Sequence, residues 1–169
     1  SKIELEEGFN FNTAKGYTEM QEFLKNYKNL ESEPLNFNYS KLINIHARNI
    51  YFPFVQAIET NFFGSNLRNS NFQNSKLKSS NLRKTILRSL NGKKANLTKT
   101  NLTKTNLYRA NLTGANLNHA KLYKANLCFA KLDCANLDYA DLRNSNFDKT
   151  RLLEVSIKNA EIEGIKNIE

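Results

Sequence analysis

A period of five residues governs this chain and runs in one unbroken register from Leu35 to Glu169. The register holds 27 quintets, whose central residue is Leu in 16, Phe in five and Ile in two. The residue two places before the centre is Ala, Ser or Thr in 20 quintets, and the residue between them is Asn in 14. Self-similarity over so many copies is typical of solenoids, in which each repeat packs only on its neighbours.

A period of five fits neither an α-helix nor a flat strand. On a helix, successive central residues would circle the axis and form no apolar face. On a strand, an odd step would place them on alternate faces. If the chain instead turns one corner in each quintet, every central residue points toward one axis and four sides close a coil of 20 residues. The 27 quintets then predict nearly seven coils.

Four quintets lack a large central residue, and each has a bulky residue two places earlier. We interpret this as a compensation of volume between two inward positions, which a close-packed interior requires. The pairs are Ile45 with Ala47, Val55 with Ala57, Leu90 with Gly92, and Ile165 with Asn167.

Quintets such as Ala95-Asn96-Leu97-Thr98-Lys99 and Ala115-Asn116-Leu117-Asn118-His119 resemble the pentapeptide-repeat family. The resemblance covers residues 35–169, about four fifths of the chain. It implies an all-β solenoid, a right-handed quadrilateral β-helix of about seven four-sided coils.

Residues 1–34 lack the repeat and are predicted to form a short N-terminal helical cap. The segment Thr18-Glu19-Met20-Gln21 matches a capping box, and apolar residues at helical spacing follow it as far as Leu30, before Pro34. These signals predict a helix over about 18–31. A solenoid needs such an element over the open core of its first coil. A helix that docks on a partner is the alternative.

The charge of the chain is strongly basic, with 25 Lys and Arg against 16 Asp and Glu. Residues 35–169 alone carry 21 basic and nine acidic residues, a net charge of +12. Between Thr60 and Leu132 there are 14 Lys or Arg and no Asp or Glu. This balance predicts attraction to anionic partners.

Residues 20 apart should lie directly above one another in such a coil, and the basic residues then form two outward columns. We predict an arginine column of Arg48, Arg68 and Arg88, with Arg109 and Lys149 on the same side. We predict a lysine column of Lys84, Lys104 and Lys124 on the neighbouring side, with Arg83, Lys121 and Arg143 beside it. Apart from Lys149, all of these are candidate residues for binding an anion or a partner, and Tyr108 and Tyr123 lie among them. The alternative is that the basic faces only keep the rod soluble and prevent lateral sheet pairing.

Residues that carry chemistry are scarce. His46 and His119 have no further ligand at suitable spacing, so no metal site is expected. Cys128 and Cys134 are expected to be ordinary outward thiols, which suit a reducing, cytoplasmic location. A packed interior leaves no room for a substrate or cofactor, so we expect no enzyme. No apolar run approaches the length of a membrane-spanning helix, and the first seven residues lack the apolar core of a signal peptide.

For the function, we expect first a non-catalytic protein-interaction or scaffold module built on a basic rod. The alternative is binding of a polyanion, either nucleic acid or an anionic surface, through the stacked Arg and Lys residues. The family resemblance implies a third interpretation, because several members bind DNA gyrase by resembling duplex DNA in shape and negative charge and so protect it from quinolones. The charge of this chain is the opposite.

The C-terminal end is predicted to be a surface for a two-fold contact between two copies of the chain. The isoleucines Ile157, Ile162, Ile165 and Ile168 crowd the last coil, which should expose apolar core and unpaired backbone. An isologous end-to-end contact would cover both. The alternatives are that terminal residues, including Asn167, fold across the opening, or that the end is bare because the chain is cut short.

Overall fold

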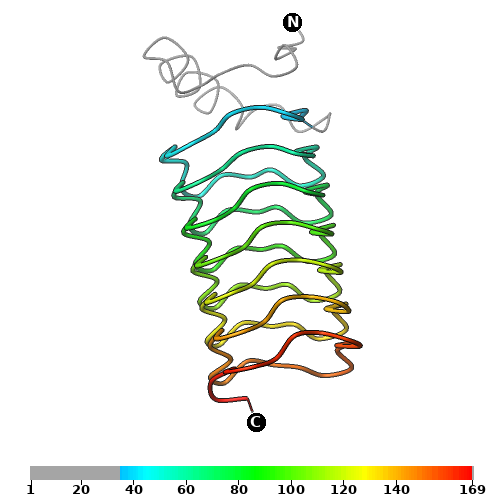
Figure 1. Cartoon of the computed structure of the whole chain (residues 1–169). Helices are drawn as coiled ribbons and strands as arrows, with labels where there is room; N and C mark the ends of the chain where they lie inside the picture. The colour runs from blue at the N-terminus through cyan, green and yellow to red at the C-terminus, as the bar shows by residue number, and fades with distance from the viewer. Residues whose placement is uncertain (1–34, 169) are drawn as a thin grey trace, which may run out of the picture.

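A computed structural model describes residues 35–168, which form a stack of four-sided coils (Figure 1). The colour changes steadily from one end of the stack to the other, so each coil lies between the coils that precede and follow it in sequence. The predicted N-terminal cap over 1–34, with its helix at about 18–31, lies outside the described residues.

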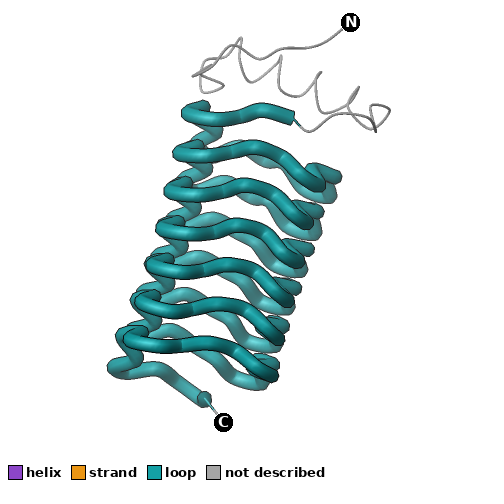
Figure 2. Tube along the Cα trace, turned by 90° about the vertical axis from the view of Figure 1, so that its right-hand side faces the viewer, coloured by secondary structure: helices purple, strands orange, loops and turns teal. Residues whose placement is uncertain are grey.

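Successive coils are joined by parallel bridges between residues 20 apart, from Asn36↔Gln56 to Asn146↔Lys166. This register confirms a coil of four quintets. Within residues 35–168 there is no helix and no strand longer than one bridge residue, so the tube in Figure 2 is drawn as loop throughout. The expected β-structure is therefore reduced to single bridges, because a corner in every quintet leaves each side too short for a continuous strand.

At nearly every corner the carbonyl of the central residue accepts the N–H three residues later in a β-turn, as in Thr100 N to Leu97 O at 3.1 Å. At two corners the N–H donates to a serine of the next coil instead, Ile45 N to Ser65 Oγ and Ile50 N to Ser70 Oγ. The residue two places after the centre has a φ between 53° and 68° in every quintet from Tyr39 to Gly164. A positive φ at the second of the two central turn residues is the signature of a type II turn. Only three of these 26 residues are glycine, so most corners hold a left-handed non-glycine residue.

The quintet 95–99 shows where the backbone N–H groups go. Ala95 N donates to Gly92 O across the corner at 3.0 Å, and Asn96 N donates to the preceding coil at 2.8 Å. Leu97 N and Lys99 N donate to the following coil at 2.7 and 2.9 Å. Thr98 N has no backbone acceptor and donates to Oδ1 of Asn96 at 3.1 Å. All five groups are thus satisfied, four by the backbone and one by a side chain.

The repeated asparagine supplies this fifth acceptor throughout the stack. All 14 asparagines at the position before the centre accept the N–H two residues later. Asp141 does the same for Arg143. A short side chain whose oxygen can accept the N–H two residues later forms an Asx turn. This explains why Asn recurs at this position.

The core is a continuous column of central residues, and all of them from Phe37 to Phe147 are buried. Leu107 and Leu117 are fully buried, as the periodicity predicts. Most of the buried Ser and Thr residues two places earlier donate their hydroxyls to carbonyls of the preceding coil, as in Thr100 Oγ1 to Leu77 O at 2.9 Å, whereas Ser145 donates to Leu142 O of its own corner and Ser75 Oγ has no partner among the described residues. Apart from Ser75, the buried hydroxyls for which a bond is found are compatible with the dry interior because that bond replaces the one to water.

The predicted compensation of volume is present at three of the four pairs. Ile45 with Ala47, and Val55 with Ala57, are buried together. At Gly92, an added Cβ would lie 2.8 Å from Leu112 Cδ2 and 3.4 Å from Leu90 Cδ2, so neighbouring leucines fill the space of a central side chain. The fourth prediction is wrong, because Asn167 is exposed at the last corner and no described coil packs over it.

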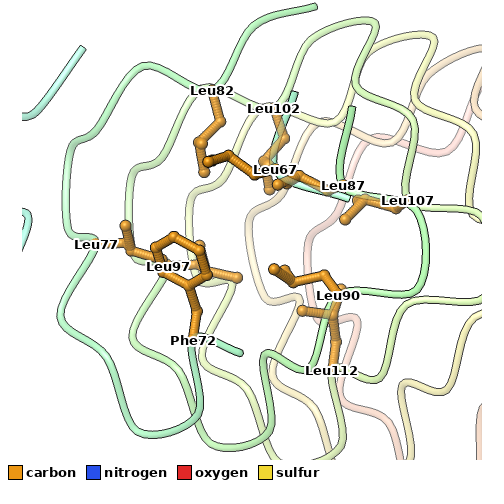
Figure 3. Close-up of a pocket in the computed structure, with 10 residues that line it drawn as sticks. All are labelled: Leu67, Phe72, Leu77, Leu82, Leu87, Leu90, Leu97, Leu102, Leu107 and Leu112. Atoms are coloured by element: carbon orange, nitrogen blue, oxygen red, sulfur yellow. The ribbon is translucent and has the colours of Figure 1, made fainter. Parts of the chain in front are cut away.

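One small cavity lies inside the core between the leucines and the phenylalanine drawn in Figure 3, from Leu67 to Leu112. Its volume is about 10 Å³, the lower limit for a single water molecule. Every lining residue is Leu or Phe, so the cavity offers no polar partner and is dry. A substrate has no room in it.

Candidate partner-binding surface

We number the four sides of the rod by the central residues of one coil. Leu117 lies on the first side, Leu122 on the second, Leu127 on the third and Leu132 on the fourth, and residues 20 apart share a side. The arginine column lies on the third side, where Asn49 N donates to Arg68 O and Asn69 N donates to Arg88 O, both at 2.9 Å. These bonds fix the three arginines one coil apart in direct register. Arg48 and Arg68 are exposed, whereas Arg88 is partly buried.

Two aromatic rings, Tyr108 and Phe129, follow the arginine column on the same side in the next two coils. The Arg88 guanidinium lies 4.9 Å from the centroid of Tyr108, and that of Arg109 lies 5.2 Å from the same ring. Arg109 also lies 5.8 Å from the centroid of Phe129, and Lys149 Nζ lies 5.1 Å from it. The two rings meet edge to face at 5.6 Å. We call these five residues the ring–cation cluster.

The lysine column lies on the second side at the corner with the third. Lys84 N donates to Thr103 O and Lys104 N donates to Tyr123 O, at 3.0 and 2.9 Å, which fixes the register of the column. Lys84 Nζ lies 5.7 Å from the centroid of Phe63, and Lys124 Nζ lies 5.0 Å from that of Tyr123. Arg83, Lys121 and the three column lysines are exposed.

Arg143 differs from the other candidates because it is paired with carboxylates. Its Nε and Nη2 donate to the two oxygens of Asp141 at 2.8 and 2.9 Å, and Nε also lies 2.9 Å from Glu161 Oε2. The hydrogen bonds from Arg143 hold the pKa of Asp141 below its ordinary value. The charge of Arg143 is therefore already compensated, and this residue is a poor site for a further anion.

The remaining candidates have no carboxylate partner in the described part of the chain. The ion pairs found within residues 35–168 involve only Arg143 and Arg151, both near the C-terminal end. Arg88 Nε is buried and has no hydrogen-bond partner among these residues. Apart from the buried Arg88 Nε, the cations of both columns lie beside aromatic rings or are exposed, and no carboxylate of the described residues pairs with them.

A family model described as pentapeptide repeats matches eight copies of the motif, in segments 58–91, 90–127, 110–148 and 130–165. These segments together span 58–165, well over half of the chain. The chain belongs to the pentapeptide-repeat family. Pentapeptide-repeat proteins fold as right-handed quadrilateral β-helices.

Two solved structures are among those that match this chain. HetL, involved in heterocyst differentiation regulation in the cyanobacterium Nostoc sp. strain PCC 7120, is 21% identical, with a TM-score of 0.45 over 79% of this chain and 77% of its own. The fluoroquinolone resistance protein QnrB1 is 14% identical, with a TM-score of 0.48 over 82% of this chain and 87% of its own. No curated protein matches the chain significantly.

Both cysteines of this pentapeptide-repeat protein are free thiols. Cys134 is exposed, and its Sγ lies 3.7 Å from Glu154 Oε2. Desolvation and the Glu154 carboxylate raise the pKa of this thiol, which disfavours the reactive thiolate. His119 stacks on Tyr139 with a centroid distance of 4.9 Å. Within the same residues, no three His, Cys, Asp or Glu side chains gather as metal ligands would.

The C-terminal isoleucines lie at the open end of the stack. Ile157, Ile162 and Ile168 are exposed, while Ile165 is partly buried against the core.

The described residues contain no helix with the length and hydropathy to cross a membrane.

Phe63 and Phe129 are functional candidates that sequence reasoning missed. Both are outward residues beside cations, and each lies on the side of one column. A search for aromatic residues 20 or 21 positions from a basic residue, and so one coil away on the same side, would have identified both phenylalanines.

Proposed function

We propose that this pentapeptide-repeat protein is a non-catalytic interaction module, a scaffold that presents a basic rod to an acidic surface of a partner protein. The packed interior, whose cavity is dry and of about 10 Å³, leaves the outer faces as the binding surface. The observation that carries the proposal is the absence of any carboxylate between Thr60 and Leu132, where 14 basic residues lie.

Like charges in a column repel one another, by somewhat under ~1 kcal/mol for each neighbouring pair in water. An anionic partner would relieve this repulsion and gain from the regular spacing of ~4.8 Å between coils. Because backbone hydrogen bonds fix the spacing of the columns, the partner would meet cations that arise from a regular, rigid backbone.

The test is the binding of a fluorescein-labelled polyglutamate peptide, followed by anisotropy at about 50 and 200 mM salt. We expect Arg68→Glu combined with Lys104→Glu to weaken binding at least about tenfold, and binding to fall as salt rises. The matched control is Lys78→Glu with Lys94→Glu, which makes the same charge change on exposed residues of the first and fourth sides. Equal losses in the two double variants would show that net charge acts without the columns.

Binding of nucleic acid or another polyanion is a second candidate function. The position of two arginines beside an aromatic ring favours it. The guanidinium groups of Arg88 and Arg109 lie 4.9 and 5.2 Å from the centroid of Tyr108, and aromatic rings among cations suit nucleic acid better than an acidic protein. A DNA mimic that occupies gyrase is disfavoured, because all charged residues from Thr60 to Leu132, on all four sides, are basic, opposite to the charge of DNA.

A further inference from the structure

We propose that the ring–cation cluster on the third side is a binding site for single-stranded nucleic acid. The inference rests on the second candidate function, binding of a polyanion, and deepens it by naming one side and one class of ligand.

The cluster alternates cations and rings across successive coils. Arg88 covers Tyr108 from the coil before, Arg109 lies within reach of both rings, and Lys149 lies over Phe129 from the coil after. A cation near a ring centroid is attracted by the ring without using an N–H group on a protein acceptor. The rings therefore favour these positions of the two arginines and leave their N–H groups without a carboxylate partner in the described residues.

No carboxylate within the stretch from Thr60 to Leu132 competes for these donors. The nearest acidic residue on the same side is Asp148, which adjoins Lys149 at the C-terminal end of the cluster. None of the ion pairs within residues 35–168 involves Arg88, Arg109 or Lys149. The buried Nε of Arg88, which has no partner in this part of the chain, is one donor still unsatisfied.

Phe129 is what favours a single strand over a duplex. Its side chain is 38% exposed, and its φ of 59° is costly for a bulky residue, so an asparagine would fit this corner better. A phenyl ring makes no hydrogen bond and can offer an outside ligand only its apolar faces and edge. Unpaired bases stack on such rings, while a duplex presents phosphates and keeps its bases stacked on each other.

The length of the third side suits a short single strand. From Arg48 to Lys149 the side spans five coil steps, about 24 Å at the usual spacing between strands. This is enough for the smaller single-strand sites, of about four nucleotides. Arg48 and Arg68 would continue the phosphate contacts beyond the rings.

The experiment compares an oligothymidine of about 12 nucleotides with a duplex of the same length, both fluorescein-labelled, by anisotropy at about 50 to 200 mM salt. The decisive variant is Phe129→Asn, which retains every charge and places a residue suited to positive φ at the corner. Its matched control is Tyr139→Asn, at the same quintet position on the first side, where the ring is 47% exposed. Melting curves of both variants check that the fold is retained.

We expect the wild type to bind oligothymidine more tightly than the duplex. Phe129→Asn should weaken oligothymidine binding about tenfold, without changing either its salt dependence or duplex binding, and Tyr139→Asn should change neither. Arg88→Gln with Arg109→Gln should weaken both ligands and reduce the slope of log K against log salt for the single strand by about 1.4.

Unchanged oligothymidine affinity in Phe129→Asn, or duplex binding as tight as that of the single strand, would overturn the inference and leave polyanion binding standing. If only a polyglutamate peptide binds, the partner is an acidic protein surface and the inference is wrong. If none of the three probes binds at about 50 mM salt, the proposed function fails as well.

Discussion

The central leucines of this rod occupy sites that cannot close when a side chain is shortened, because backbone bonds hold the coils above and below each one. We expect Leu107→Ala and Leu117→Ala each to lower the free energy of unfolding by about 2–5 kcal/mol. Urea denaturation followed by circular dichroism measures this. Leu153→Ala is the control, since that side chain is 64% exposed, and its effect should stay within about 0.5 kcal/mol. Equal midpoints for all three variants would contradict a core built on these leucines.

The asparagine before each centre gives a second prediction for single residues. Asn101 accepts the N–H of Thr103 at 3.1 Å, and without it that partly buried donor has no protein acceptor. We expect Asn101→Ala to reduce the free energy of unfolding by about 1 kcal/mol. Asn118→Ala is the matched control, because Asn118 points outward one place after the centre. Equal stability of the two variants would show that the backbone donor is satisfied in another way.

The sequence alone reveals that Asn recurs and that Leu107 and Leu117 face inward, because both follow from counting positions. The role of Asn could not be predicted in the same way. It depends on which backbone N–H lacks an acceptor, and that is known only when the corner has its left-handed residue and the coils are in register.

The columns arise between neighbouring coils, because residues 20 apart lie above one another. Lys104 lies between Lys84 and Lys124, and no carboxylate lies within their stretch of sequence. We expect Lys104→Glu to raise the free energy of unfolding at low salt by less than about 1 kcal/mol, because two repulsions become attractions. The gain should disappear at about 1 M salt. Lys104→Gln should give a smaller gain, and a gain that persists at high salt would rule out the electrostatic cause.

At this scale, the 20-residue register predicts the columns, and the backbone ladder has the same register. The contacts within a column do not follow from the register. Arg88 on Tyr108 and the pairing of Arg143 with Asp141 depend on side-chain conformations, which a position in a quintet does not specify. The single-residue bridges likewise follow from how little chain remains between corners.

Along the whole rod, the charges are unevenly distributed. Eight of the nine acidic residues in the repeat follow Leu132, whereas the stretch from Thr60 to Leu132 is purely basic. A mimic of duplex DNA needs negative charge along its length. We therefore expect the protein neither to inhibit the supercoiling activity of gyrase nor to protect the enzyme from a quinolone. Inhibition at stoichiometric concentration would show that shape outweighs charge.

We also propose a contact between two copies at the C-terminal end. Ile162 is 55% exposed there, and Ile157 and Ile168 of the same end are exposed as well. We expect sedimentation velocity to show a dimer at tens of micromolar and Ile162→Lys to convert it to a monomer, because the charge would be buried in the contact. Ile86→Lys, an equal change on an exposed residue of the third side, should leave the dimer intact. A wild type that is monomeric at this concentration would contradict the proposal.

The register of 20 residues has a consequence for how such a rod tolerates insertions and deletions. Removing a whole coil would shorten the rod and return every later residue to its own side. Removing one quintet would leave a core that packs equally well, but every later residue would shift by one side. If residues 96–100 were lost, Thr113 would take the place of Tyr108 above Arg88, and the ring–cation cluster would be dispersed. The stability of the rod therefore tolerates insertions and deletions in multiples of five residues. The binding surface is retained only when their length is a multiple of 20.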